Sequence, residues 1–262
     1  EDTLIYESWN IRGVLPEILT IGVLGYSSSF EINYLIEHLG ERGHQVIQRN
    51  RIGKDRFRYD VINTLSSKAE SILDQLPMID VLLLDAREFD QLSDSEKQRI
   101  GEAIDTGLDV ILNAPSENAL DAWEEAFVTL SGEEIKLEQL NRLNERNWFP
   151  EGAKKERVRE SIPLLNLDLK EWEEKVEVLN DYSANTPLSI RAKKENGSIT
   201  AHLFYKTYGW LLSGSGEVYN QFWTNYLSRA ITLESSQLSF TPTIPRKNHR
   251  IDIFVTETGS DS

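Results

Sequence analysis

The sequence predicts an α/β domain built around a parallel sheet. Short apolar runs of strand length alternate with amphipathic stretches of helix length, which is the pattern of strand–helix–strand crossovers. The apolar runs are continuous rather than alternating, as expected for strands that are buried on both faces. The chain has 262 residues, 39% of them hydrophobic and 27% charged, so it can enclose one large core.

Four apolar runs predict the parallel strands, and they cover Leu19–Leu24, His44–Arg49, Asp80–Leu84 and Asp109–Leu112. Three helices are expected between them, over Phe30–Glu41, Val61–Leu76 and from Ser93 to Gly107. Ser93 and Glu96 have the spacing of a capping box, which fixes the start of the third helix. Right-handed crossovers leave few topologies, and we expect a flavodoxin-like, three-layer sheet with strand order 2-1-3-4.

The second half of the chain is less regular. A helix is expected over Ala119–Leu130, and residues 133–180 are interpreted as a helical insertion or lid that includes a helix over Glu133–Arg146. Asn196-Gly197 predicts a hairpin turn, and the flanking strands are expected over Leu188–Lys193 and Ser198–Phe204. A helix follows over Glu217–Ile231, and two strands are expected over Leu238–Thr241 and Arg250–Val255. This gives one domain over residues 1–235 and a C-terminal β extension, or the start of a further module, over 236–262.

Composition excludes several classes of function. The net charge of −15 repels nucleic acid and anionic membrane surfaces. The chain has no cysteine, and its four histidines do not form a pair with metal-ligand spacing, so neither a metal site nor a cofactor is expected. No apolar run is long enough to cross a membrane. Because the sequence starts at Glu1 without a methionine, we expect either a mature form or a soluble piece of a longer protein, and we favour the second.

One segment is locally basic in this acidic chain. Residues 50–59 and the preceding Arg49 carry Arg51, Lys54, Arg56 and Arg58. A charge run of this kind usually belongs to a solvated loop that pairs with acidic neighbours. The sequence therefore predicts a loop here, and an electropositive binding surface is the alternative.

Candidate ligand-binding residues follow the predicted strands, where the carboxyl ends of parallel strands border a site. The candidates are Gly25, Tyr26, Ser27, Ser28, Asp85, Arg87, Asn113 and Ser116. The Gly/Ser turn could cradle a phosphate at a helix N-terminus, although its spacing fits no phosphate-loop motif and hydroxyl side chains are also ordinary helix caps. Asp85, Arg87 and Glu88 could line a small polar site or form surface ion pairs.

Two stretches, Ile79–Pro115 and Asn196–Ile231, resemble class I glutamine amidotransferase-like domains. The second stretch carries Thr207, Tyr208, Trp210, Leu212, Gly214, Tyr219 and Trp223 at positions that match one branch of that family. The resemblance implies an extracytoplasmic, periplasmic module of a large membrane-anchored bacterial protein, with a cytoplasmic location as the alternative. It also implies a protein partner, or other domains of the same parent chain, and no insertion of this segment into the membrane.

An active member of that family needs a strained Gly-x-Cys-x-Gly turn that exposes a thiolate. The equivalent turn here, residues 113–118, has no cysteine and no glycine. Ser116 paired with His202 is a weak catalytic candidate, whereas Ser116 as a helix N-cap is the simpler interpretation. The expected function is therefore a non-catalytic binding or scaffolding module. The alternatives are a hydrolase or transferase that uses Ser116, and a small-ligand sensor.

Overall fold

The structure is a computed structural model, and it describes residues 18–26, 29–64, 72–113, 120–133, 146–148, 161–164, 176–180, 187–230, 238–240 and 255–257. Contacts divide the chain into two compact units. The larger unit is Ile18–Thr232, and the smaller one combines Glu1–Glu17 with Leu233–Ser262. In the smaller unit, β11 (Leu238–Phe240) pairs antiparallel with β12 (Val255–Glu257). All candidate site residues belong to the larger unit.

A mixed sheet of eight strands forms the centre of the larger unit, in the order β3-β2-β1-β4-β5-β10-β9-β8. Its strands are β1 (Thr20–Tyr26), β2 (Gln45–Gly53), β3 (Arg56–Ile62), β4 (Val81–Asp85), β5 (Asp109–Asn113), β8 (Glu177–Asn180), β9 (Pro187–Lys194) and β10 (Gly197–His202). Strands β2, β1, β4, β5 and β10 are mutually parallel, and β3 and β9 run against them. The carboxyl ends of the parallel strands therefore meet at one edge.

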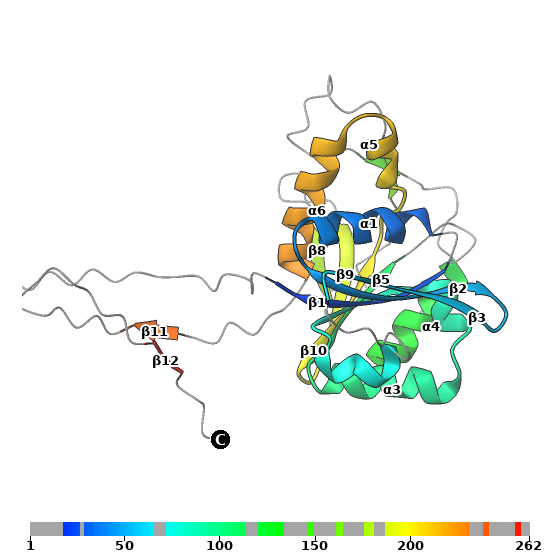
Figure 1. Ribbon diagram of the computed structural model, residues 1–262, viewed down its shortest axis with the longest axis vertical. Helices are drawn as coiled ribbons and strands as arrows, with labels where there is room; N and C mark the ends of the chain where they lie inside the picture. Colours follow the sequence, from blue (N-terminus) through cyan, green and yellow to red (C-terminus); the bar gives the residue numbers. More distant parts are fainter. Residues whose placement is uncertain are drawn as a thin grey trace, which may run out of the picture. The chain divides into compact units, whose positions relative to one another are not determined.

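Helices cover both faces of this sheet (Figure 1). On one face lie α1 (Phe30–Glu41), α5 (Tyr208–Leu212) and α6 (Gly216–Ala230), and on the other lie α3 (Asp94–Asp105) and α4 (Leu120–Ser131). The short helix α2 (Ala86–Asp90) directly follows β4. Large aromatic side chains are buried on both faces of the sheet. Trp210 of α5 and Trp223 of α6 are buried on one face, and Trp123 and Phe127 of α4 are buried on the other. Removal of this apolar surface from water is the main stabilising contribution.

The α/β prediction is confirmed, and the four predicted strands lie in the order β2-β1-β4-β5. The third helix begins where the capping box predicts, because Ser93 Oγ accepts from the Glu96 amide and the Glu96 carboxylate accepts from the Ser93 amide. The Asn-Gly hairpin is also present, since β9 and β10 pair antiparallel across Glu195 and Asn196. Glu195 adopts a left-handed φ of 48°, which the tight turn requires.

The predicted basic loop at 50–59 and the predicted helix over Val61–Leu76 are wrong. Strand β2 continues to Gly53, the chain turns at Lys54 and Asp55, and β3 returns antiparallel to β2. The alternation of large and charged residues along β3 suits an edge strand with period two better than a helix. Only a 3₁₀ helix, η1 (Ile72–Met78), remains of the predicted helix among the described residues.

The sheet is also less uniform than the predicted three-layer parallel sheet, because antiparallel strands extend it at both ends. Part of the predicted insertion at 133–180 belongs to it, since β8 pairs with β9. Within the same segment, β6 (Arg146–Trp148) and β7 (Ile162–Leu164) form a separate antiparallel pair. The body of the helix predicted over Glu133–Arg146 lies outside the described residues. The domain boundary at residue 235 stays a prediction.

Candidate functional site

Polar side chains form a row across the carboxyl-terminal edge of the sheet. Gly25 of β1 lies opposite Asn50 of β2, and Asp85 of β4 lies opposite Asn113 of β5. All four strands are parallel neighbours, so these residues share one edge although they come from distant parts of the sequence. Asn50, Asp85 and Asn113 are buried. A buried polar row of this kind needs hydrogen-bond partners, which makes it the candidate site.

Asp85 and Arg87 form a hydrogen-bonded part of this row. The Asp85 carboxylate accepts from the Arg87 amide, at 3.0 Å, and caps α2. It also accepts from Nε of Arg87 at 3.1 Å and from Nη2 at 2.9 Å. The guanidinium carbon lies 4.9 Å from the centre of the Tyr26 ring at the end of β1. The ion pair with Asp85 therefore holds the partly exposed guanidinium group of Arg87 against the Tyr26 ring, where β1 and β4 end side by side.

Asn50 and Gly25 are in close contact on the α1 face. A Cβ atom at Gly25 would collide with Oδ1 of Asn50 and would touch Ile32 of α1. Any side chain at position 25 would therefore require the Asn50 side chain to move. Among the described residues, Oδ1 of Asn50 has no hydrogen-bond partner. Asn50 was not among the candidates from the sequence, because only the pairing of β1 with β2 brings it to this edge.

Asn113 ends β5 with both polar atoms of its amide unsatisfied. The side chain is 5% exposed, and neither Nδ2 nor Oδ1 has a hydrogen-bond partner within the described part of the chain. A buried amide in this state costs about 1–3 kcal/mol for each group that has lost water. Asn113 therefore offers one donor and one acceptor side by side at the strand ends.

His202 lies further along the same edge, at the end of β10, but in an aromatic environment. Its ring stacks on Phe204 at 4.5 Å between centroids and meets the edge of Tyr226 at 5.1 Å. Burial lowers its pKa to about 3, so the ring is neutral at physiological pH. Neither ring nitrogen has a hydrogen-bond partner in the ranges the structure describes. A catalytic base of the proposed kind needs an orienting carboxylate, and no described residue supplies one.

The other candidates from the sequence fall outside the described residues. These are Ser27, Ser28 and Ser116. The Ser116–His202 pair and the role of Ser116 as an N-cap therefore stay predictions. Ser29, which follows the Gly/Ser turn, is buried, and its side chain makes no capping hydrogen bond to α1.

A second buried polar group joins three helices on the α1 face. The Thr207 hydroxyl donates to Oε1 of Glu31, and Nε1 of Trp223 donates to Thr207 Oγ1 at 3.0 Å. Burial raises the pKa of the Glu31 carboxyl to about 7, although the Thr207 hydroxyl and nearby amides of residues 206–208 oppose the increase. Thr207 and Trp223 are fully buried, and both are hydrogen-bonded within this group. We interpret it as a connection of α1 to α5 and α6.

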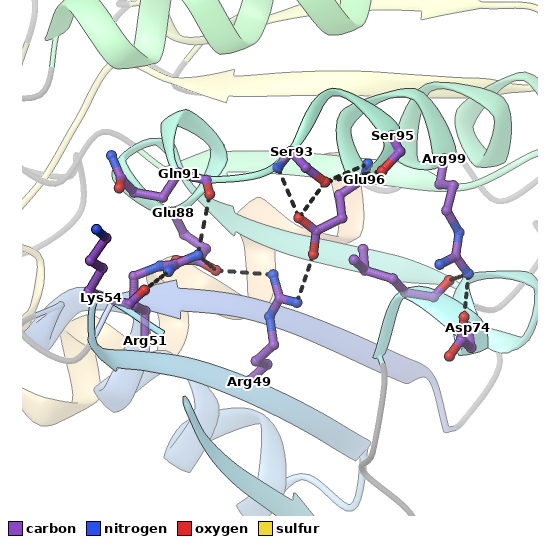
Figure 2. A network of polar contacts seen from close by, with 11 residues as sticks. Arg49, Arg51, Lys54, Asp74, Glu88, Gln91, Ser93, Ser95, Glu96 and Arg99 are labelled. Carbon is purple, nitrogen blue, oxygen red and sulfur yellow. Dashed lines mark hydrogen bonds and ion pairs between the residues drawn. The ribbon is translucent and has the colours of Figure 1, made fainter. Parts of the chain in front are cut away.

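The basic segment forms a third polar group, on the opposite face of β2 (Figure 2). Glu88 of α2 accepts from Arg51 Nε at 2.6 Å and from Arg49 Nη2 at 3.1 Å. Arg49 also reaches Glu96 at 3.2 Å, and both guanidinium groups stack on Phe57. Burial raises the pKa of Glu88, while the two arginines oppose the increase. Arg49 and Arg51 therefore have a structural role. They were predicted to lie in a solvated loop, but they form ion pairs inside the protein.

The sequence contained no pattern that identified Glu31 or Asn50 as members of these groups. Glu31 resembles an ordinary acidic residue in a first helical turn, and its partner Thr207 is 176 positions away. Among the described residues, no group of three or more acidic or histidine side chains is placed to hold a metal ion. Within the same residues, no helix combines the length and apolarity that a membrane-spanning helix requires.

Comparisons with known proteins give no family. No family model matches the chain, and no curated protein matches it. Similar solved structures include the exo-beta-1,4-mannosidase Op5Man5 from Opitutaceae bacterium strain TAV5, with 11% identity over 82% of this chain and 36% of that chain and a TM-score of 0.42. The beta-galactosidase from Bacillus circulans sp. alkalophilus gives 14% identity, 92% and 35% coverage, and a TM-score of 0.34.

A third similar structure is Gan42B, a GH42 beta-galactosidase, with 11% identity, 85% and 31% coverage and a TM-score of 0.38. The chain thus spans about a third of the length of each of these proteins. At these TM-scores the similarity supports no conclusion about the fold or the chemistry of the chain. The topology described above is therefore taken from the strand pairing alone.

The predicted membership of the class I glutamine amidotransferase-like family is corrected: no family model matches the chain, and the similar solved structures are a mannosidase and two beta-galactosidases rather than amidotransferases. The flavodoxin-like description is corrected by the strand pairing, because antiparallel strands extend the sheet at both ends. The non-catalytic scaffold rested on the resemblance and is not shown. The physical reason lies in the two stretches that carried the resemblance. Ile79–Pro115 supplies β4, α3 and β5, and the second stretch supplies β10 and the aromatic core of α5 and α6. Many α/β proteins contain such elements, so the two stretches do not identify a family.

Proposed function

We propose that the larger unit binds a small, neutral, hydroxyl-rich molecule at the carboxyl ends of β1, β4 and β5. A simple sugar or polyol has the required chemistry. The observation that carries the proposal is the buried Asn113 amide, whose donor and acceptor have no partner among the described residues. The proposal concerns binding.

The topology supports this location. Helix α1 follows β1 on one face of the sheet, whereas α3, which follows β4, lies on the other face (Figure 1). Adjacent strands whose connections leave on opposite faces create a crevice at their carboxyl ends, and ligands of open α/β sheets bind there. Tyr26 and Arg87 border this position, and Asn113 follows on the next strand.

The electrostatics favour a neutral ligand. Arg87 is neutralised by its two-point pair with Asp85, and the chain carries a net charge of −15. A free anion would therefore be repelled from most of the surface. Asn113 offers one donor and one acceptor, and the Tyr26 ring offers an apolar face. A hydroxyl-rich ring can use both kinds of contact, because it has hydroxyl groups at its rim and C–H groups on its faces.

The direct experiment is a thermal-shift and calorimetric screen of the full 262-residue chain. Glucose, galactose, mannose, inositol and glycerol form one arm, and phosphate and citrate form the other. We expect saturable stabilisation by a member of the first arm, because a ligand that binds only the native state raises its apparent stability. Stabilisation by the anions alone, or by no compound, would contradict the proposal.

The variant Asn113→Leu separates a ligand-binding role from a structural one. It removes the unsatisfied amide but keeps the branched shape and the number of side-chain heavy atoms, so the unliganded protein should be as stable as the wild type or more stable by about 1 kcal/mol. Ligand binding should be lost. Asn33→Leu, at an exposed position of α1, is the matched control and should retain binding. A large loss of stability in Asn113→Leu without ligand would show that the amide serves the fold.

A further inference from the structure

Strand β3 forms one edge of the eight-stranded sheet and exposes several side chains. Within the described residues its only strand partner is β2. Tyr59 is 41% exposed and Val61 is 40% exposed, and both belong to the face that carries Phe57. An edge strand with exposed apolar residues is a template for another strand, and native proteins usually protect such an edge. The edge is therefore available for pairing with another strand.

The sequence of β3 is complementary to itself in antiparallel orientation. We propose that β3 pairs with β3 of a second copy of this chain, across a two-fold axis that passes through Tyr59. In this register Arg58 lies opposite the second copy's Asp60, and Phe57 lies opposite its Val61. Tyr59 meets its own counterpart. A two-fold interface requires each contact to occur twice, and this register provides two ion pairs and two apolar pairs directly opposite each other.

The charges of the two residues support the register. Arg58 Nε and Asp60 Oδ2 lie 2.6 Å apart on the same face of β3. Their side chains are 67% and 38% exposed, so both can reach a neighbouring strand. When two copies align, each arginine lies between the carboxylate of its own chain and that of the other. A shift by one residue would move the apolar side chains to the opposite face and break this match.

The location on the surface also favours self-association. Two copies of a chain with a net charge of −15 repel each other. The β2–β3 hairpin is close to neutral, because Arg49 and Arg51 are paired with Glu88 and the remaining Lys54, Arg56 and Arg58 stand against Asp55 and Asp60. The β2–β3 hairpin is thus a place where two acidic copies can approach with little repulsion. A second copy of the chain would cover the exposed edge of β3, so no other partner has to be invoked.

Charge exchange tests the register in the full chain. Arg58→Asp and Asp60→Arg each place like charges opposite one another, and we expect the dissociation constant of the dimer to rise about tenfold or more. The double variant Arg58→Asp/Asp60→Arg restores opposite charges and should dimerise as the wild type does. An equimolar mixture of the two single variants should form a heterodimer. Analytical ultracentrifugation over a concentration series measures all four cases.

Crosslinking provides a second measurement, because the chain has no cysteine. Tyr59→Cys places one thiol opposite its counterpart, so a disulfide-linked dimer should form under mild oxidation. Met78→Cys, at an exposed residue of another element, is the matched control and should stay monomeric. The proposal is overturned if the wild type is a monomer at every concentration tested or if both thiols crosslink equally. It is also overturned if the charge exchanges leave the dissociation constant of the dimer unchanged.

Discussion

At the scale of single residues, Glu31 is a buried carboxyl group whose ionisation affects stability near neutral pH. Burial raises its pKa from 4.5 to about 7, so the folded chain holds a proton that the unfolded chain releases between these values. The free energy of unfolding should therefore fall as pH rises through this window, by about 3 kcal/mol in total.

Glu31→Gln should remove this slope, because an amide cannot ionise. Glu37→Gln, at an exposed carboxylate of the same helix, should leave the slope unchanged. Urea denaturation at pH 5, 6, 7 and 8 measures the difference between the variants. Parallel curves for the wild type and Glu31→Gln would show that Glu31 does not titrate there.

Glu88 gives a second prediction at the residue scale. It is fully buried between Arg49 and Arg51 (Figure 2), so Glu88→Gln leaves the buried Arg51 without its carboxylate partner and Arg49 with Glu96 alone, and it should cost about 3–5 kcal/mol. Asp60→Asn removes the exposed partner of Arg58 and should cost less than about 1 kcal/mol. Equal losses of stability in chemical denaturation would contradict the structural role of Glu88.

At the scale of the element, α3 depends on local sequence. Both halves of its capping box are formed, so Ser93→Ala should lower the free energy of unfolding by about 1 kcal/mol. Gln98→Ala removes only a side-chain pair with Glu102 on the same helix and should cost about 0.2–0.5 kcal/mol. Denaturant melts of the two variants compare these losses, and an equal loss would show that the cap is not used.

The elements also show what the sequence could predict. The strands β1, β4 and β5, the helix α3 and the β9–β10 hairpin follow from local patterns: continuous apolar runs, a capping box and an Asn-Gly turn. The β2–β3 hairpin was missed because its arginines look solvated in sequence. Arg49 and Arg51 are paired with a glutamate 39 and 37 positions away, and charge pattern alone contains no information about so distant a partner.

At the scale of the whole molecule, the candidate site depends on the sheet as a unit. Asp85, Arg87, Tyr26 and Asn113 were predicted because each follows a strand. Asn50 was not predicted, since its place beside Gly25 depends on which strands are neighbours. The family resemblance was wrong for a related reason: motifs that describe a strand, a capped helix and another strand specify a local unit, whereas a family is defined by its site.

The most direct test of the proposed site is the side-chain amide of Asn113 in a ¹⁵N–¹H NMR titration of the full chain. The pair of resonances that disappears in Asn113→Leu identifies this amide. On addition of the sugar or polyol that stabilises the protein, we expect these resonances to shift in a saturable way, because the unsatisfied amide gains hydrogen bonds. If the ligand binds while the Asn113 resonances stay in place, the ligand lies elsewhere and the proposed site is contradicted.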